Sequence, residues 1–420
     1  MRSLSARTAS LDGRLLRQRG AIPNRPGEQT HADSVDWILL VLVLLLLCFG
    51  LTMVFSASSV VSLRLHGDAS YFFRRQLIFS ILGLACMFAV YRTPRAFLEK
   101  MQYPLLFICL LMLILVLTPL GVTVNWARRW INLKFIRVQP MEFAKIALVF
   151  YLAFFLSAKQ HIIKTFSRGI LPPFIITGTF CLLLLRQPDF GGATVLAMLL
   201  FFMCLVGGTR LLYLVISGLF AGGAATLLII MEPYRLQRFT SFIDPEANAL
   251  DGGYQLIQSF YAIGSGGLFG KGLGAGMQKF FYLPERHTDF ILAVLSEELG
   301  LLGITAVFLL MALLIWRSMR IAFRQPDLRG RLTVFGLTLV LAIPMLLNAA
   351  VVSGSMPTKG VPMPFFSYGG TALLSSLICI GLLLNYSRGL NRKTPTGQGS
   401  GARSGLQSVP AFFKGGRSGD

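Results

Sequence analysis

About ten apolar runs, separated by short polar segments, divide most of the sequence. A helix that crosses a bilayer needs about 20 mostly apolar residues, because lipid offers no partner for its backbone N–H and C=O groups. We therefore predict an all-α polytopic membrane protein with about ten transmembrane helices. The predicted spans are residues 35–55, 76–91, 103–120, 143–156, 170–185, 193–206, 211–231, 290–316, 332–352 and 371–386.

Composition excludes a soluble globular protein, since only 14% of the 420 residues are charged and 54% are hydrophobic. Soluble chains carry about 25% charged residues. The net charge of +21 suggests nucleic acid, but Lys and Arg are concentrated in the tails and in alternate loops. The positive-inside rule therefore predicts that both termini are cytoplasmic, with no nucleic-acid partner.

The sequence predicts one membrane domain between two polar tails. Residues 1–34 and 387–420 contain too few apolar side chains to fold and are predicted to be disordered cytoplasmic segments. The membrane domain, 35–386, contains a long external loop at 232–288, whose apolar content favours short amphipathic helices. All six cysteines fall within apolar runs without metal-type spacing, so we predict neither a disulfide nor a zinc site.

Ionisable residues inside predicted spans are the strongest functional signal, because each costs at least ~2.5 kcal/mol at the bilayer centre. Asp289 stands at the entrance of the eighth predicted span, which also contains Glu297 and Glu298. Glu142 and Lys145 are three residues apart in a predicted helix and share one face. Mutual neutralisation would explain this pair, but two leucines would be cheaper, so we favour a functional role.

Polar residues on the predicted outer side have competing interpretations. Arg128 and Arg129, between two tryptophans, either anchor the chain at the headgroups or bind an anionic phosphate. Asp189 is explained by a turn and by capping the sixth predicted span, although a site role stays open. A basic and aromatic stretch at 71–76 is interpreted as an interface anchor.

Two glycine-rich stretches predict close backbone packing. The run 264–276 is not a phosphate-binding loop, because Gly272 follows Lys271 where Ser or Thr is required, and we predict no nucleotide cofactor. Its glycines instead favour close approach of helices and loops. The stretch 355–371 holds several prolines and glycines, which predicts irregular backbone lining a cavity. Pro344 predicts a kink, with Asn348 one turn later to bond freed carbonyls or a neighbour.

Several motifs in order resemble the SEDS family (shape, elongation, division and sporulation) over residues 35–390. They are PERHTDF at 284–290, EELG at 297–300, QPMEFAK at 139–145, QPDFG at 187–191, GYQ at 253–255, QS at 258–259 and SYGG at 367–370. MPTKG at 356–360 and MVFSAS at 53–58 resemble the cell-division branch more than the elongation branch. Trp126 and Met141 depart from the family, which usually has Gly and Ser there.

The resemblance implies a glycosyltransferase that polymerises lipid II, a disaccharide-peptide on undecaprenyl pyrophosphate. It also implies a class B penicillin-binding protein and other cell-division proteins as partners, in the bacterial inner membrane at the septum. The family's essential aspartate falls on Asp289, and its inner pair on Glu142 and Lys145. The alternatives are a lipid II transporter, an elongation-type polymerase or a non-catalytic scaffold.

Inverting transfer requires a base for the acceptor hydroxyl and positive charge for the departing pyrophosphate. We therefore predict Asp289, Lys145 and Glu142 as catalytic residues, with Asp289 as general base or metal ligand. Mg²⁺ or Mn²⁺ held by Asp289 or Glu142 is the predicted cofactor. The predicted substrate- or pyrophosphate-binding residues are Arg128, Arg129, Gln139, Gln258, Arg286, His287, Lys359 and Ser367.

Overall fold

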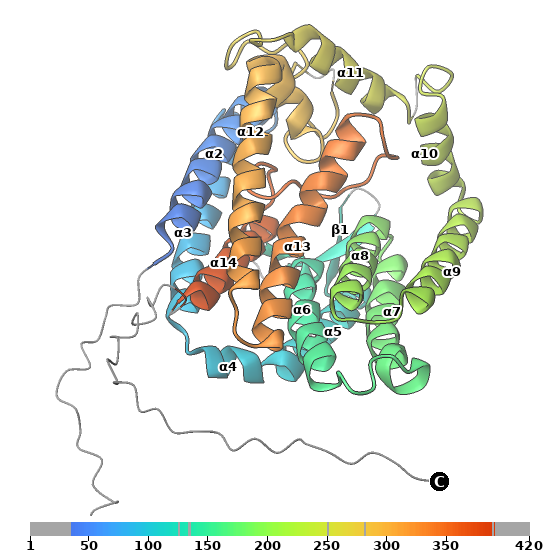
Figure 1. The fold of residues 1–420 in the computed structure, drawn as a ribbon. Helices are drawn as coiled ribbons and strands as arrows, with labels where there is room; N and C mark the ends of the chain where they lie inside the picture. The colour runs from blue at the N-terminus through green and yellow to red at the C-terminus, as the bar shows by residue number, and fades with distance from the viewer. Residues whose placement is uncertain are drawn as a thin grey trace, which may run out of the picture.

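The structure is a computed structural model that describes residues 35–124, 127–132, 136–249, 252–280, 283–388 and 390. The predicted tail 1–34, nearly all of the predicted tail 387–420, and Trp126 lie outside the described residues. In the described part the chain forms a bundle of long helices, with α10 and α11 at the upper end in Figure 1.

The prediction of about ten spans is confirmed. Within the described residues, eight helices are long and apolar enough to cross a membrane, and α5 and α8 are shorter apolar helices at the two other predicted positions. The ten are α2 (Trp37–His66), α3 (Tyr71–Arg92), α5 (Gln102–Leu117), α6 (Pro140–Ala158), α7 (Leu171–Arg186), α8 (Phe190–Val206), α9 (Leu211–Ile230), α12 (Ile291–Phe323), α13 (Leu328–Val352) and α14 (Gly370–Ser387).

In the part of the chain that the structure describes, four short helical elements connect the spans. They are α4 (Arg95–Lys100), the π-helical turn η1 (Phe166–Ile170) that leads into α7, α10 (Pro233–Ile243) and α11 (Tyr254–Gly266). The last two lie between α9 and α12, in the segment where the sequence predicts amphipathic helices.

The helices differ widely in how much of their surface the protein covers. In α6, α13 and α14 most residues are buried, and α6 packs against α5, α8 and α13. In α9 only Leu214 is buried, and Figure 1 shows this helix at the edge of the bundle. A helix that is apolar all round is stable at the edge only if its surroundings are apolar too, as in lipid.

A small antiparallel sheet was not predicted. Its strands are β1 (Gly121–Val124), β2 (Ala127–Asn132) and β3 (Arg137–Val138), in the order β1-β2-β3. Such short strands leave almost no alternating pattern in the sequence. The sheet matters for the site because successive side chains of β2 point to opposite faces.

The eighth span is not the continuous helix that the sequence predicts from residue 290 to 316. Gly300 has φ 66° and ψ −165°, so α12 is broken there into a short helix, 291–299, and a long one, 301–323. The glycine-rich segment caps the short helix: Lys271 N donates to Glu297 O (3.0 Å) and Gly272 N to Glu298 O (2.9 Å). A Cβ on Gly300 would lie 2.4 Å from Gly270 N, so close backbone packing explains these glycines, as predicted.

Glu297 and Glu298 are fully buried and fix this arrangement. Oε1 of Glu297 accepts from Lys271 Nζ (2.8 Å), and Glu298 accepts from Lys279 Nζ (3.0 Å). Ser56 of α2 donates to both carboxylate oxygens of Glu298, at 2.7 and 2.6 Å. Because a buried carboxylate is stable only with such partners, the two acids hold the segment between α11 and α12 against α2 and α12.

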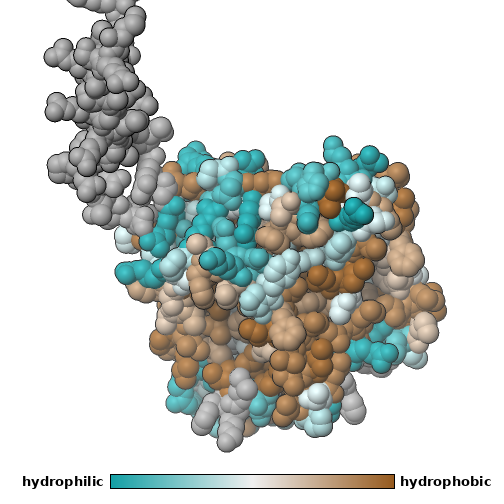
Figure 2. Space-filling model, turned by 90° about the horizontal axis from the view of Figure 1, so that it is seen from below, coloured by the Kyte–Doolittle hydropathy of each residue, from teal (hydrophilic) through white to brown (hydrophobic). Residues whose placement is uncertain are grey.

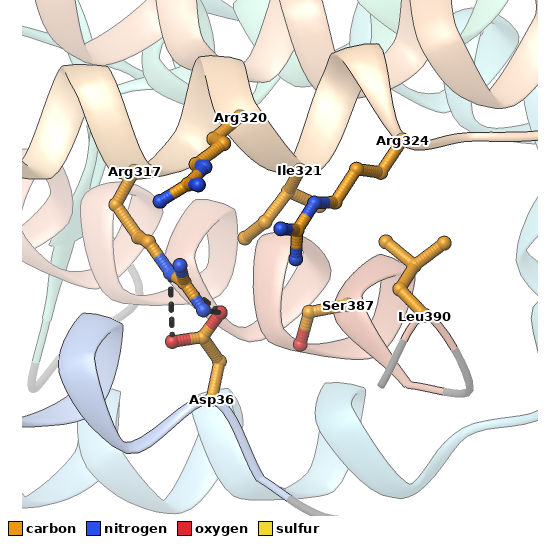
Figure 3. A pocket seen from close by; sticks show the side chains of 7 residues that line it. All are labelled: Asp36, Arg317, Arg320, Ile321, Arg324, Ser387 and Leu390. Carbon is orange, nitrogen blue, oxygen red and sulfur yellow. Dashed lines mark hydrogen bonds and ion pairs between the residues drawn. The ribbon is translucent and has the colours of Figure 1, made fainter. Parts of the chain in front are cut away.

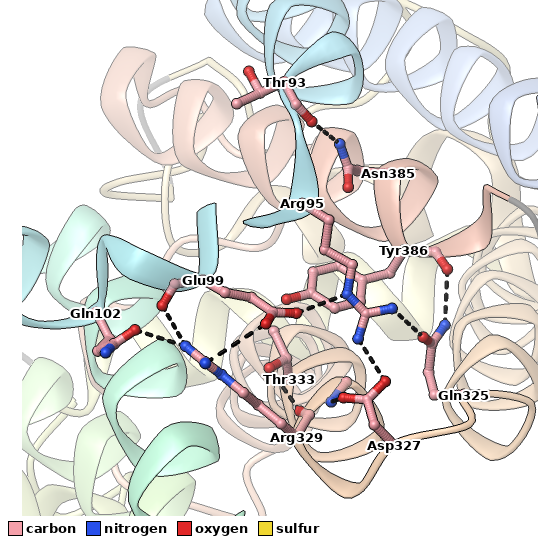
Figure 4. A network of polar contacts seen from close by, with 11 residues as sticks. Thr93, Arg95, Glu99, Gln102, Gln325, Asp327, Arg329, Thr333, Asn385 and Tyr386 are labelled. Atoms are coloured by element: carbon pink, nitrogen blue, oxygen red, sulfur yellow. Dashed lines mark hydrogen bonds and ion pairs between the residues drawn. The ribbon is translucent and has the colours of Figure 1, made fainter. Parts of the chain in front are cut away.

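Ion pairs tie the helices together at the lower end. Arg95 donates to Glu99 (2.7 Å), Gln325 (3.1 Å) and Asp327 (2.8 Å), which joins α4 to the start of α13 (Figure 4). Arg329 contacts Glu99 again, with 3.5 Å between Nη1 and Oε2. These contacts close the lower end of the bundle.

A second lower-end cluster joins the start of α2 to the end of α12. Arg317 binds Asp36 through Nε and Nη2, with 2.8 Å from Nη2 to Oδ2, beside a hollow that Arg320 and Arg324 also line (Figure 3). Seen from below, hydrophilic residues gather over one part of the molecule and apolar residues cover much of the rest (Figure 2).

Replacing Gly300 by Ala should destabilise the protein. The new Cβ would clash with backbone atoms of residues 268 and 270 and would force a φ of 66° on an L-residue. Such strain costs on the order of 1–3 kcal/mol, so the midpoint of thermal unfolding of detergent-purified protein should fall. Gly264→Ala is the matched control, because a Cβ on this α11 residue meets nothing within 4 Å. Equal midpoints for the two variants would contradict the role given to Gly300.

Candidate active site

Asp289 lies in a compact turn that closes on Glu285. The backbone N–H groups of Thr288 and Phe290 both donate to Glu285 O, at 3.2 and 3.1 Å. The Thr288 hydroxyl also donates to the Glu285 carboxylate (2.7 Å). This turn precedes the short helix 291–299, so Asp289 stands just before the first residue of α12, at the entrance of the eighth span as predicted.

Three hydrogen bonds fasten the turn, and each ends on a backbone carbonyl of residues 287–289. Tyr368 N donates to the carbonyl of residue 287 (2.8 Å), Ser367 Oγ to that of residue 288 (2.6 Å) and Asn348 Nδ2 to that of residue 289 (2.8 Å). The donors belong to α13 and to the irregular segment 353–369 that follows it. The Asp289 backbone is therefore fixed without using its carboxylate.

The Asp289 carboxylate faces Arg129 and Gly360. A Cβ built on Gly360 would lie 3.4 Å from Asp289 Oδ2 and 3.7 Å from Arg129 Nη1, so these groups converge on that glycine. Arg129 Nη1 is also 3.7 Å from Asp189 Oδ1. Asp189 keeps its predicted cap on α8, where it accepts from Gly192 N (3.0 Å), but it belongs to the site as well.

The pKa of Asp289 is raised from its ordinary value to about 7. Burial among protein groups is the main cause, and the negative charge of Glu285 acts in the same direction. Arg238 and Arg129 oppose the shift, while Asp189 adds to it. A carboxylate with a pKa near neutrality is a competent proton acceptor.

Two further cations line this region. Arg238, on α10, donates to Thr358 O (3.3 Å), which brings the external segment over the loop that contains Gly360. Arg238 was not predicted, because nothing in a charged amphipathic helix reveals which loop it folds onto. Lys359, a predicted site residue, lies 5.3 Å from the ring centre of Phe190, and burial lowers its pKa.

Arg128 and Arg129 are separated, although the sequence grouped them. They are adjacent on β2 and so point to opposite faces of the sheet. Arg129 donates to Pro188 O beside the site, whereas Arg128 is exposed and its Nη1 is 3.4 Å from Thr118 O. The structure brings only Arg129 to Asp289.

Glu142 and Lys145 form the predicted pair inside α6, with 2.7 Å between Oε2 and Nζ and both side chains buried. Ser375 of α14 donates to the same carboxylate (2.8 Å). Among the described residues no hydrogen bond or ion pair joins the pair to Asp289. The pair therefore holds α6 to α14.

The remaining predicted residues have varied positions. Ser367 is buried and uses its hydroxyl on the backbone, accepting from Met363 N (2.8 Å) and donating to the turn. Arg286 is buried, and burial lowers its pKa. Gln139 precedes α6 without capping it through its side chain, and Gln258 is half-buried on α11.

The sequence predicts a metal ion at Asp289 or Glu142, and the two carboxylates differ in how many partners they already have. The Glu142 carboxylate is occupied by Lys145 and Ser375. Within the described ranges, no group of three or more His, Cys, Asp or Glu side chains is arranged to hold a metal ion. Asp289 would need oxygen ligands from a substrate to bind Mg²⁺ or Mn²⁺.

Known proteins resemble the chain over most of its length. It is 44% identical over 364 residues to the probable peptidoglycan glycosyltransferase FtsW of Trichlorobacter lovleyi, covering 86% of this chain and 96% of that protein. It is 42% identical over 360 residues to the stage V sporulation protein E of Bacillus subtilis, covering 86% and 98%.

Solved structures share the fold. A chain from a structure described as "Structural coordination of polymerization and crosslinking by a peptidoglycan synthase complex" superimposes with a TM-score of 0.70 at 31% identity, covering 86% of this chain and 99% of that one. The rod shape determining protein RodA of Thermus thermophilus gives a TM-score of 0.63 at 31% identity, covering 84% and 97%.

A family model described as "Cell cycle protein", built on FtsW, RodA and SpoVE, matches residues 36–392, which include every motif on which the resemblance depends. The chain therefore belongs to the FtsW/RodA/SpoVE family, the SEDS family.

Proposed function

We propose that this chain is a peptidoglycan glycosyltransferase that polymerises lipid II into glycan strands during cell division. The observation that carries the proposal is Asp289: its carboxylate has a pKa of about 7 and receives no hydrogen bond from the described residues. It faces Arg129, with Arg238 and Lys359 nearby. The relatives named peptidoglycan glycosyltransferase support the same activity.

The proposed reaction is a single displacement with inversion. The acceptor hydroxyl oxygen bonds to the anomeric carbon of the donor, the bond from that carbon to the pyrophosphate oxygen breaks, and polyprenyl pyrophosphate leaves. Asp289 accepts the hydroxyl proton. Arg129, Arg238 and Lys359 stabilise the negative charge that develops on the pyrophosphate.

Mg²⁺ or Mn²⁺ stays part of the proposal as a cation that the pyrophosphate would bring to the Asp289 carboxylate. Oxygen ligands from a carboxylate and phosphates are those that both ions prefer. Such a cation would neutralise leaving-group charge, and the arginines would do the same without it. Removal of divalent cations by a chelator before a polymerisation assay separates the two cases.

The proposed partner is a class B penicillin-binding protein that crosslinks the product, together with other cell-division proteins. One solved relative belongs to a peptidoglycan synthase complex that coordinates polymerisation and crosslinking, which supports such a partner. We place the upper end of the bundle outside the inner membrane and both termini in the cytoplasm. Several relatives are named FtsW, which supports the septum as the site of action rather than the side wall.

Transport of lipid II is the alternative function. A transporter must open toward both sides of the membrane in turn. The lower end is held by the ion pairs of Arg95, Arg329 and Arg317, whereas Asp289 and its cations gather around the irregular segment 353–369. This one-sided arrangement favours polymerisation.

Replacing Asp289 by Asn should abolish polymerisation, because an amide cannot accept the acceptor proton. We expect a loss of at least about 10²-fold in the rate of glycan formation from lipid II by purified protein. The thermal unfolding midpoint should be unchanged, because the turn is fixed through backbone carbonyls. Parental protein that leaves lipid II unpolymerised in detergent would favour the transporter, and full activity of the Asn variant would rule out Asp289 as the base.

The rate should depend on pH through Asp289. Only the ionised carboxylate accepts a proton, so kcat/KM should rise as pH increases toward about 7 and level off above it. The initial rate of polymerisation, measured between about pH 5 and about pH 9, reports this ionisation. A profile that is flat across neutrality would contradict the raised pKa.

The buried pair can be tested by comparing single and double variants. Glu142→Leu leaves the Lys145 charge buried without its partner, which should destabilise the protein by about 3–5 kcal/mol. The double variant Glu142→Leu/Lys145→Leu should recover most of the unfolding midpoint but remain inactive, if the pair positions α6 for catalysis. If the double variant recovers both stability and polymerisation, the two side chains serve only to neutralise each other.

A further inference from the structure

Five aromatic rings from four separate segments form one cluster beside the candidate active site. Tyr71 stacks on His66, with ring centres 3.7 Å apart and planes at 13°. Phe72 contacts both of these rings and also meets His287 (5.1 Å) and Tyr368 (5.0 Å). We call these five residues the aromatic cluster.

The cluster adjoins Asp289 through the backbone. His287 is two residues before Asp289 in the same turn, and Tyr368 N donates to the His287 carbonyl (2.8 Å). Ser367, next to Tyr368, holds the carbonyl of residue 288 (2.6 Å). The backbones of His287 and Tyr368 are thus tied to the turn that contains the proposed base.

The rings are not a closed hydrophobic core. His66 is exposed, and the other four rings are only half-buried. Two cations accompany them: Arg75 Nη1 donates to the Tyr71 hydroxyl (3.0 Å), and Arg75 and Arg137 both act to lower the pKa of Tyr368 against the effect of burial. Burial also lowers the pKa of His287, which favours its uncharged ring.

Anchoring at the headgroups explains a single tyrosine or phenylalanine at the end of a span. It does not require rings from α2, α3, the turn 285–290 and the segment 353–369 to pack on one another, nor to meet at the turn that contains Asp289. A sugar ring has an apolar face of C–H groups and a polar edge, which half-buried aromatic rings flanked by hydrogen-bond donors match.

We propose that the aromatic cluster is a saccharide-binding platform on which the acceptor sugar of the polymerisation reaction stacks, with its reactive hydroxyl directed to Asp289. The acceptor role of this platform depends on the proposed function being correct. It assigns a substrate role to Tyr71, Phe72 and Tyr368, which the sequence interpretation gave to headgroup anchoring or to no function.

Saccharide binding should be measured on purified full-length chain with Asp289→Asn, in which turnover is blocked. The probe is a soluble tetrasaccharide of alternating N-acetylglucosamine and N-acetylmuramic acid, followed by saturation-transfer NMR. Tyr368→Leu removes one ring and should weaken binding about fivefold to tenfold, whereas Tyr368→Phe keeps the ring and should bind like the parent. Both substitutions leave the backbone N–H of residue 368 in place.

Phe72→Leu is a second test on a different helix, and it should weaken binding in the same way. In chains with Asp289 intact, the ring-removing variants should raise KM for lipid II more than they lower kcat. Equal affinity of the Tyr368→Leu and Tyr368→Phe variants at equal unfolding midpoints would overturn the proposal. An absence of saturation transfer between the Asp289→Asn chain and the tetrasaccharide would also overturn it. Failure of the unsubstituted chain to make glycan from lipid II would instead overturn the proposed function.

Discussion

The hydrogen bonds that end on the carbonyls of residues 287–289 are the interactions on which the candidate site depends. They come from Asn348 on α13 and from Ser367 and Tyr368 in the segment after it. Because all three end on backbone carbonyls of the turn, they hold Asp289 in place without occupying its carboxylate. Glu142, Glu297 and Glu298 are buried, and each carboxylate ends in an ion pair. The half-buried Asp289 carboxylate has no such close partner among the described residues, which is why we propose it, and not the other three, as the reactive acid.

Much of the fold and of the candidate site could be predicted from the sequence, because a polar or charged side chain inside a bilayer costs free energy. The apolar runs gave the spans, and Asp289, Glu142 and Lys145 were conspicuous for the same reason. The pair was predictable at residue level, since a helix places positions three apart on one face. Asn348 was predictable only as a polar group near Pro344. Which carbonyls it bonds depends on a turn almost 60 residues earlier in the chain.

What could not be predicted depends on contacts between distant segments. The break at Gly300 looks like any glycine in an apolar helix until the loop near Gly270 packs against it. Arg238 reaches the site because α10 packs over residue 358, and no local feature of the sequence predicts this contact. Arg128 and Arg129 seemed equivalent because β2 was not recognised, and only strand geometry separates them. The interpretation of Tyr71 and Phe72 as anchors overlooked their neighbours for the same reason.

The seating of the glycine-rich segment on the short helix 291–299 has an evolutionary consequence. Its backbone N–H groups meet the helix carbonyls, and several of its glycines have positive φ or lie against backbone, so the spacing of these glycines matters more than the identities of the exposed residues between them. Homologous chains should therefore exchange exposed residues such as Phe269 and Leu273 freely, while insertions or deletions between Gly266 and Gly276 are selected against. The length of a surface loop usually varies among homologous chains, but the length of this loop should be conserved.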